Sequence, residues 1–232
     1  MTLPPGATRH AQVRRVQPGD TVVLFDGLGS DWPATVLQVT RSAVAVRTAE
    51  AMAVDCELPL HVTLALGMPA NERMDALVEK ATELGVARIQ PLLTERSVLR
   101  LSGERADRKR EHWQAVAEAA CEQCGRARVP VVEPVRLLLD WLHSRAAATS
   151  SADERRLLLN PAAAAARSLT DAMLNPKTGS PFEVVTLSGP EGGLSAEECR
   201  AARLHGFVDV GLGPRVLRAD TAPLAVLAWL GL

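Results

Sequence analysis

Long apolar segments are absent from this 232-residue sequence. No stretch approaches the roughly 20 apolar residues that a membrane-spanning helix needs. The first fifteen residues also lack the apolar core of a secretory signal. The sequence therefore predicts a cytoplasmic protein that contacts no membrane. Hydrophobic residues still make up 47% of the chain and charged residues 23%, so we expect a folded protein with a core.

Tyrosine is missing, aromatic residues make up only 3% of the chain, and lysine stands only at Lys80, Lys109 and Lys177. So few aromatic side chains argue against an RNA-binding sheet that stacks bases. The formal net charge of −1 gives no general attraction to nucleic acid, so any RNA binding must use a local patch. Nearly all basic residues are arginines, whose planar fork suits phosphates and base edges; the codon usage of the source explains the same excess equally well.

Zinc-ligand spacing and the P-loop pattern are also absent. Cys121 and Cys124 form a C-x-x-C, but no second pair of cysteines or histidines stands at zinc-ligand spacing from it. We expect these two, like Cys56 and Cys199, to be reduced thiols, with the pair in a helix rather than at a redox turn. The sequence thus predicts no metal site and no P-loop nucleotide site.

A short β-rich region comes first. The predicted strands are 21–25, 34–40 and 43–47. Because turn residues separate these short runs, they predict a small barrel or sheet. A basic cluster precedes them, with members Arg9, His10, Arg14 and Arg15. Such a cluster favours RNA contact and a solvated arm equally.

Beyond a boundary near residues 55–59, strands and helices alternate. The predicted strands are 61–66, 88–93, 129–132, 156–160, 183–188 and 207–211. The predicted helices are 71–84, 106–124, 135–147 and 162–174, with two more that begin at Ser195 and Asp220. This alternation favours a mainly parallel sheet covered by helices on both faces. We therefore expect two domains, 1–58 and 59–232.

The last two helices carry clear signals. The helix that begins at Ser195 has a capping box, since Glu198 stands three residues later, and it ends at Gly206. The helix after Asp220 is apolar on every side. One of its faces can pack on the sheet, and the other then needs a partner, so we expect a homodimer.

Two glycine-rich loops, 189–193 and 211–215, each follow a predicted buried strand. Ligands of α/β proteins bind where parallel strands end, so we expect both loops to line one pocket. Glycine lets the backbone approach a ligand, and its exposed N–H groups can bind an adenine edge or a ribose. Gly211 and Gly213 begin a dinucleotide pattern, but Val216 replaces its third glycine, which disfavours a nicotinamide-dependent oxidoreductase.

The residues around both loops carry a resemblance. They read LSGPEGGLS over 187–195 and LGPRVLR over 212–218, followed by Thr221 and Ala222. Further motifs stand upstream in the family's order: His10, Arg14, PGD at 18–20, FDG at 25–27, RMD at 73–75, EKATELGV at 79–86, PLLTERS at 91–97 and EQCGR at 122–126. Over nearly its whole length, the sequence resembles the bacterial 16S ribosomal RNA uracil N3-methyltransferases of the SPOUT superfamily.

Several positions depart from the pattern of that family. Ala70 and Asn71 stand where a lysine-glycine pair is usual, and Asn160 replaces a frequent histidine. Ala219 and Asp220 stand where threonine and glutamate are usual, and the aromatic opening of many members is missing. None of these changes removes a glycine loop, so they bear on RNA recognition more than on cofactor binding.

The resemblance implies an α/β fold in which a SPOUT-type parallel sheet with a C-terminal deep trefoil knot follows a small β-barrel PUA-like domain. It implies a homodimer, joined through the knotted domain and the last helix, with its active site at the subunit interface. The implied reaction is S-adenosylmethionine-dependent methylation of uracil N3. Its substrate is a specific uridine of 16S rRNA, in the decoding region near the 3′ end, within the 30S subunit.

The resemblance also implies site residues. Those for S-adenosylmethionine are Leu187, Gly189, Pro190, Glu191, Gly192, Gly193, Leu212, Gly213, Arg215 and Leu217. Those for RNA are Arg9, His10, Arg14, Arg73, Arg96 and Arg126. We expect catalysis first from Arg218 and Glu191, although Glu191 could instead cap backbone amides. Glu95 and Asp220 are further candidates for the base that takes the N3 proton, and Arg96 and Arg126 are further candidates to stabilise the uracil anion.

Other functions stay open at this point. A SPOUT enzyme could methylate a ribose 2′-hydroxyl of another RNA, and a non-catalytic RNA-binding ribosome-assembly factor could keep the same fold. The longest basic run comprises Arg96, Arg100, Arg105, Arg108, Lys109 and Arg110, with Arg126 and Arg128 after it. It fits either RNA phosphates or a solvated helix face.

Overall fold

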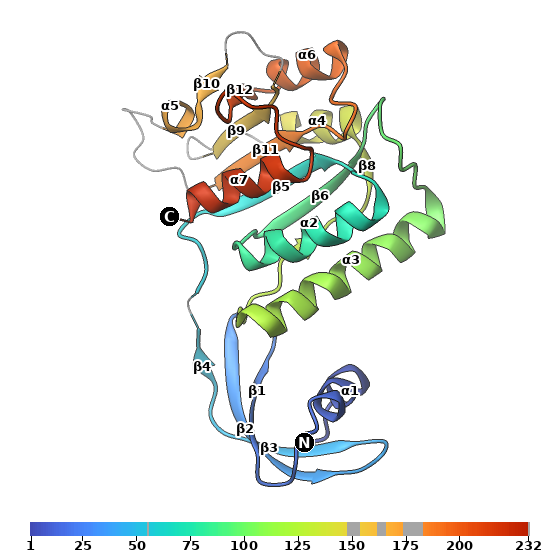
Figure 1. Ribbon diagram of the computed structural model, residues 1–232, viewed down its shortest axis with the longest axis vertical. Helices are drawn as coiled ribbons and strands as arrows, with labels where there is room; N and C mark the ends of the chain where they lie inside the picture. The colour runs from blue at the N-terminus through green and yellow to red at the C-terminus, as the bar shows by residue number, and fades with distance from the viewer. Residues whose placement is uncertain (55, 148–153, 162–165, 174–182, 232) are drawn as a thin grey trace. The chain divides into compact units, whose positions relative to one another are not determined.

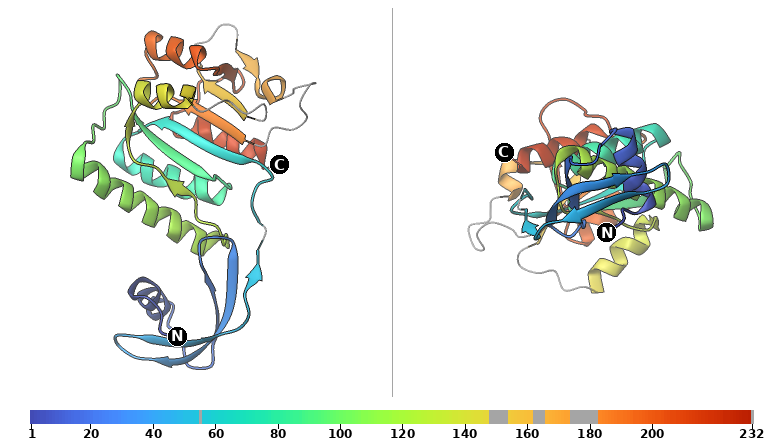
Figure 2. Two further views of the ribbon diagram at one scale, coloured as in Figure 1. Left: turned by 180° about the vertical axis from the view of Figure 1, so that it is seen from behind. Right: turned by 90° about the horizontal axis from the view of Figure 1, so that it is seen from below.

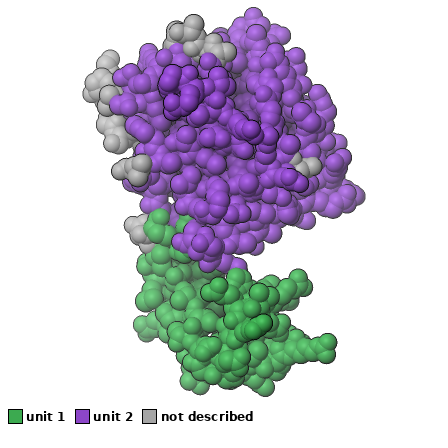
Figure 3. All heavy atoms as spheres, in the orientation of Figure 1, with its two compact units in different colours: residues 1–56, 125–128 green, residues 57–124, 129–232 purple. Residues whose placement is uncertain are grey.

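The computed structural model describes residues 1–54, 56–147, 154–161, 166–173 and 183–231. The chain divides into two compact units (Figure 3). The first, here the N-terminal unit, contains residues 1–56 and 125–128; the second, the C-terminal unit, contains residues 57–124 and 129–232.

An antiparallel sheet forms most of the N-terminal unit. Its strands are β1 (Thr21–Phe25), β2 (Ser30–Val39), β3 (Val44–Thr48) and β4 (Met52–Ala53). The long β2 pairs with each of the other three. Alternate residues such as Ala34, Val36, Val44 and Val46 face a small core. The predicted β-rich first region is therefore confirmed.

Helix α1 (Pro5–Val13) precedes this sheet and is not predicted from the sequence. Only Thr8 and Ala11 of the helix are buried, so no apolar stripe marks it. Its proline stands in the first turn, where a missing N–H costs nothing. The basic cluster predicted at the N-terminus thus lies on and just after a helix, with Arg9, His10 and Arg14 exposed.

Parallel strands form the sheet of the C-terminal unit (Figure 1). They are β5 (His61–Gly67), β6 (Arg88–Leu93), β7 (Val131–Val132), β8 (Arg136–Leu137), β9 (Glu154–Leu159), β10 (Arg167–Ser168), β11 (Glu183–Ser188) and β12 (Val208–Gly211). The order is β10-β12-β9-β11-β5-β6-β7, and β8 also pairs with β6. Every pairing among these described strands is parallel, which confirms the predicted sheet.

Helices cover both faces of this sheet (Figures 1 and 2). They are α2 (Asn71–Glu83), α3 (Gly103–Cys124), α4 (Leu138–Ala147), α5 (Leu169–Met173), α6 (Ala196–Leu204) and α7 (Thr221–Leu230). Helices α2, α3 and α7 share one core with Leu64 of β5, whereas α4 and α6 share another with Ala65. Because neighbouring residues of a strand point to opposite faces, β5 is buried on both sides.

Two predicted helices begin with short strands instead. Residues 136–137 form β8 before α4, and residues 167–168 form β10 before α5. The prediction of continuous helices over 135–147 and 162–174 is therefore wrong at these positions, and residues 162–165 lie outside the described part. Two-residue strands carry no periodicity of their own; Arg136 is extended because it pairs with Leu92 of β6.

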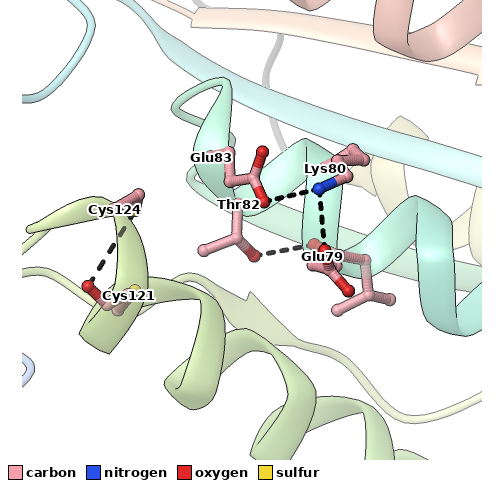
Figure 4. A network of polar contacts seen from close by, with 7 residues as sticks. Glu79, Lys80, Thr82, Glu83, Cys121 and Cys124 are labelled. Carbon is pink, nitrogen blue, oxygen red and sulfur yellow. Dashed lines mark hydrogen bonds and ion pairs between the residues drawn. The ribbon is translucent and has the colours of Figure 1, made fainter.

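The cysteine pair lies on α3, as predicted (Figure 4). The Cys124 thiol is 4.0 Å from the Cys121 carbonyl, and neither residue forms a disulfide. On α2, the Lys80 ammonium contacts the carboxylates of Glu79 and Glu83 at 2.7 and 2.8 Å, and these hydrogen bonds raise its pKa. The described residues contain no side-chain cluster suited to a metal ion. Among the described helices, none combines the length and apolar character needed to cross a membrane.

Candidate functional site

The two glycine loops lie at the carboxyl edge of the parallel sheet. Residues 189–193, the first glycine loop, follow Ser188 at the end of β11. Residues 212–219 follow β12 and are called the second glycine loop from here on, whereas the sequence predicts this loop over 211–215. Residues 160–161 follow β9. Since β9 pairs in parallel with β11 and β12, the three strands end side by side. This is the edge at which α/β sheets bind ligands.

A cavity of about 430 Å³ opens here, which we call the main cavity. Its lining comprises Arg73, Arg96, residues 159–161, residues 188–194, Cys199, residues 216–219 and Ala222. A side cavity of about 280 Å³ is lined by residues 159–161, Ala166, residues 210–217 and Ala222. Because the two cavities share residues 159–161, 216–217 and 222, they form adjacent chambers. Residues 189–193 line the main cavity and residues 211–215 line the side cavity, so the two predicted loops border adjacent chambers rather than one pocket.

The first glycine loop is tight enough to require glycine. A Cβ atom on Gly189 would lie 2.6 Å from the carbonyl carbon of Gly193 and from the nitrogen of Leu194. Gly193 has a φ of +68° and donates its N–H to the Pro190 carbonyl at 2.8 Å. Pro190 also rests on Gly67 of β5, where a Cβ would come within 2.5 Å of it. The loop backbone therefore lines the cavity directly.

Glu191 ties the first glycine loop to the start of α2. Its Oε1 accepts the N–H of Ala70 at 3.2 Å and lies 3.3 Å from Nη1 of Arg73. Ala70 is the residue before the first turn of α2, where a negative charge is favoured by the helix dipole. Of the two roles that the sequence leaves open for Glu191, this geometry favours capping.

Arg96 follows the end of β6 by three residues and contacts the same loop. The Arg96 Nη1 donates to the Gly192 carbonyl at 3.0 Å, and a Cβ added to Gly192 would lie 3.1 Å from the Cβ of Arg96. Arg73 and Arg96 thus place two guanidinium groups in the wall of the main cavity.

The second glycine loop contributes Arg215 to the side cavity and Arg218 to the main cavity. Both arginines are exposed, and neither guanidinium has a hydrogen bond or ion pair within the described part of the chain. Arg218 is therefore available to an anionic ligand. Asp220, at the start of α7, carries a buried Oδ1 without a partner. Neither it nor Glu95 belongs to the lining of the two cavities.

The floor of the main cavity is polar in places. Ser188 is only 3% exposed, and its Oγ has no hydrogen-bond partner. Asn160 donates from Nδ2 to Asp209 at 3.2 Å and to the Cys199 thiol at 3.8 Å. Burial raises the pKa of Cys199, so its thiol stays protonated at neutral pH. The hydrogen bond from Arg203 lowers the pKa of Asp209.

Most of the predicted cofactor residues lie in the walls of the two cavities, but some other predicted site residues do not. Those in the cavity walls are Gly189, Pro190, Glu191, Gly192, Gly193, Leu212, Gly213, Arg215, Leu217, Arg218, Arg73 and Arg96. Leu187 is buried in the sheet core and does not belong to the lining. Arg126 is only 5% exposed, so the prediction that it contacts RNA is not supported.

Three further residues on the floor of the main cavity, Ser188, Asn160 and Cys199, are not among the site residues that the sequence predicts. Ser188 and Asn160 follow the same rule as the glycine loops, because they stand at the ends of β11 and β9. That signal could have found them. Cys199 had no such signal, since it reaches the cavity from α6 only through tertiary packing.

Two family models match the chain. A model described as an RNA methyltransferase domain matches residues 56–231. A model described as an RNA methyltransferase PUA domain matches residues 3–48.

Three relatives illustrate the similarity. The ribosomal RNA small subunit methyltransferase E of Synechocystis sp. is 33% identical over 217 residues, which cover 94% of this chain and 67% of the relative. The crystal structure of the Neisseria gonorrhoeae protein of that name, bound to S-adenosyl methionine, superposes with a TM-score of 0.88 at 34% identity, covering 99% of this chain and 90% of the other. A Legionella pneumophila methyltransferase in complex with the same cofactor gives a TM-score of 0.87 at 34% identity and the same coverages.

Proposed function

The chain belongs to the family of ribosomal RNA small subunit methyltransferases E, and from this premise we propose its substrate and the atom that it methylates. It is an S-adenosylmethionine-dependent methyltransferase of 16S ribosomal RNA. The proposed methyl acceptor is N3 of a specific uridine in the decoding region, near the 3′ end of that RNA. The proposed substrate particle is the 30S subunit.

One observation carries this proposal: the two glycine loops line adjacent cavities, and Arg73, Arg96 and Arg218 stand in the walls of the larger one. Glycine backbone suits a nucleoside-type cofactor, because it allows close approach and offers N–H groups. Arginine in the same walls suits an RNA strand. The site thus has separate chemistry for two ligands.

The residues present fit S-adenosylmethionine. Ser188 offers an unpartnered buried hydroxyl to a polar atom of the ligand, and Leu194, Val216 and Leu217 offer apolar contacts. Gly189, Gly192 and Gly193 add no side chains of their own to the wall of the main cavity. When bound there, S-adenosylmethionine supplies an electrophilic methyl group on a sulfonium.

The chain must also handle the proton and charge of the target base. Uracil N3 lies on the pairing edge and carries a proton, so the base has to be unpaired and deprotonated. Arg218 is assigned to stabilise the anion that results, because Arg218 lines the main cavity and its guanidinium has no partner in the described chain. Glu191 is assigned to hold the first glycine loop and Arg73 in place.

Several features of the assembly belong to this proposal. Residues 1–58, with the exposed Arg9, His10 and Arg14, are assigned to RNA binding. The C-terminal unit is assigned a deep trefoil knot and a homodimer that α7 helps to form. Trp229 of α7 supports the dimer, because this large apolar side chain is 43% exposed on an apolar helix. We also propose a cytoplasmic location, because the proposed substrate is ribosomal RNA.

The test is a methylation assay with labelled S-adenosylmethionine and 30S subunits from a strain that lacks the modification. We expect label in 16S rRNA and N3-methyluridine on mass spectrometry of the digested RNA. A 2′-O-methylated nucleoside would instead support the ribose methyltransferase. A protein that binds the RNA but neither binds S-adenosylmethionine nor transfers label would support the assembly factor. Sedimentation of the purified protein tests the homodimer.

A further inference from the structure

Val98 is an exposed apolar side chain at an ordered position. It is 79% exposed, although its neighbours Ser97 and Leu99 are both buried. The chain therefore passes close over the C-terminal unit here and presents a single valine to solvent. Isolated exposed apolar residues are common, so the argument depends on what surrounds this one.

Hydrogen bonds fix the turn just before Val98. The Thr94 N–H donates to Oγ of Ser97 at 3.0 Å, and the two hydroxyls lie 2.9 Å apart. The Glu95 N–H donates at 2.8 Å to Oε1 of Glu198, whose other oxygen completes the capping box of α6. Glu198 is buried, so this anchor is shielded from water. A ligand that contacts this turn need not order it first.

Two arginines stand on either side of Val98 in the sequence. Arg96 lines the main cavity and donates to the Gly192 carbonyl at 3.0 Å. Arg100 donates from Nη2 to the Glu95 carbonyl at 3.1 Å, which brings its guanidinium next to the turn. Both bonds are to backbone oxygens, so the positive charges are positioned but not neutralised. The exposed Glu95 carboxylate leaves the segment 95–100 with a formal charge of +1.

We propose that Arg96, Val98 and Arg100, here the 96–100 platform, bind the RNA strand next to the target nucleotide. This inference rests on the proposed function and names a contact surface for its substrate. Val98 packs against an unstacked base, and the two arginines contact phosphates. RNA is favoured as the partner because Arg96 is shared with the main cavity, so the platform continues the surface along which the target strand enters.

The test compares three variants of the full-length protein: Val98→Ser, Arg100→Gln and, as the matched control, Leu204→Ser. Leu204 is 80% exposed, lies in the same unit on α6, and belongs to neither cavity. The probe is the 30S subunit from the strain that lacks the modification. Dissociation constants are measured at several salt concentrations, together with S-adenosylmethionine affinity and the thermal midpoint.

We expect Val98→Ser to weaken RNA binding about fivefold with an unchanged salt dependence, because an apolar contact is lost. Arg100→Gln should weaken binding and reduce the slope of log affinity against log salt by about 0.7, since one phosphate contact is lost. Leu204→Ser should match the wild type. Cofactor affinity and thermal midpoint should stay unchanged in all three.

Wild-type RNA affinity in both Val98→Ser and Arg100→Gln would overturn the platform while the proposed function stands. Loss of cofactor affinity or of thermal stability in Val98→Ser would also overturn it, because the residue would then be structural. A wild-type protein that binds 30S subunits but forms no N3-methyluridine would overturn the proposed function instead, and the variants would still decide the platform by binding.

Discussion

The Glu191 carboxylate lies 3.3 Å from the Arg73 guanidinium and joins the first glycine loop to α2. It also accepts the Ala70 N–H at 3.2 Å. If Glu191 acts mainly through these contacts, its ability to accept hydrogen bonds matters more than its charge. The exposed ion pair itself contributes little, because solvent screens it.

Two substitutions separate anchoring from proton transfer. Glu191→Gln keeps an acceptor oxygen for Ala70, so we expect methylation to fall only about threefold to tenfold, within the range of one ordinary hydrogen bond. Loss of a general base would cost about 10²- to 10⁴-fold. Glu191→Ala should lower cofactor affinity more than Glu191→Gln does. Steady-state kinetics and calorimetric titration measure both; a 10³-fold loss in Glu191→Gln would identify Glu191 as the base.

Arg218 should act on the reaction rather than on cofactor binding. In Arg218→Ala, the uracil anion loses its cation, and we expect the methylation rate to fall about 10²-fold. The rate should also recover at higher pH, since N3 then loses its proton to solvent more readily. Rate measurements across pH check this. Arg200→Ala, which removes an exposed arginine from α6, is the control and should change neither property. A loss in Arg218→Ala that appears only as weaker cofactor binding would contradict the assignment.

Replacing Ser188 by alanine should stabilise the free protein but weaken its binding of the cofactor. Its buried hydroxyl lacks a partner, so Ser188→Ala should raise the free energy of unfolding by about 1 kcal/mol. The same change should weaken S-adenosylmethionine binding about twofold to tenfold, because the ligand loses a hydrogen bond. Thr186→Val is a matched control: Thr186 has an equally buried, unpartnered hydroxyl on β11 but does not line the cavity. Equal cofactor affinity in both variants would remove Ser188 from the site.

Whether the first glycine loop requires glycine can be tested with a substitution that adds a single methyl group. In Gly189→Ala, the new Cβ would overlap the backbone of Gly193 and Leu194 at 2.6 Å, so the loop must move. We expect a loss of about 1–3 kcal/mol in the free energy of unfolding and a large loss of cofactor affinity. Gly6→Ala, where a Cβ meets nothing within 4 Å, should be tolerated. Chemical denaturation and calorimetry measure these changes, and a wild-type-like Gly189→Ala would disprove the tight loop.

The sequence predicts helix α2, the start of helix α6 and the edge that holds the glycine loops, because each depends on a local sequence pattern. The spacing of Met74, Leu77, Val78 and Ala81 predicted α2, and all four are buried in one core. Ser195 and Glu198 predicted the capping box that starts α6. The glycine loops could be placed at one edge because parallel strands share their direction.

Features that depend on tertiary packing were not predictable in the same way. Strands β8 and β10 exist because a neighbouring strand pairs with them, and Cys199 reaches the main cavity because α6 packs on the sheet. Arg126 belongs to a basic stretch of sequence, yet its side chain is buried. Charge in the sequence alone does not tell a surface arginine from an internal one.

The ion pair of Arg203 and Asp209 should make both the stability of the protein and its affinity for the cofactor fall at acidic pH. The hydrogen bond from Arg203, followed by one from Asn160, lowers the pKa of Asp209. A group whose pKa is lowered by folding stabilises the protein above its unfolded value, near pH 4, and loses this effect as the pH falls through the folded value. In Arg203→Gln, the pKa of Asp209 rises, so acid unfolding should begin at a higher pH. Circular dichroism during acid titration measures this shift.

Cofactor binding should follow the same titration, because Asn160 lies in the floor of the main cavity and donates to Asp209. We expect S-adenosylmethionine affinity to fall at a higher pH in Arg203→Gln than in the wild type. Arg200→Gln removes an arginine from the same helix, where its pair with Glu197 is exposed, and should leave the acid transition unchanged. Identical acid transitions in Arg203→Gln and Arg200→Gln would show that the charge of Arg203 does not set the protonation of Asp209.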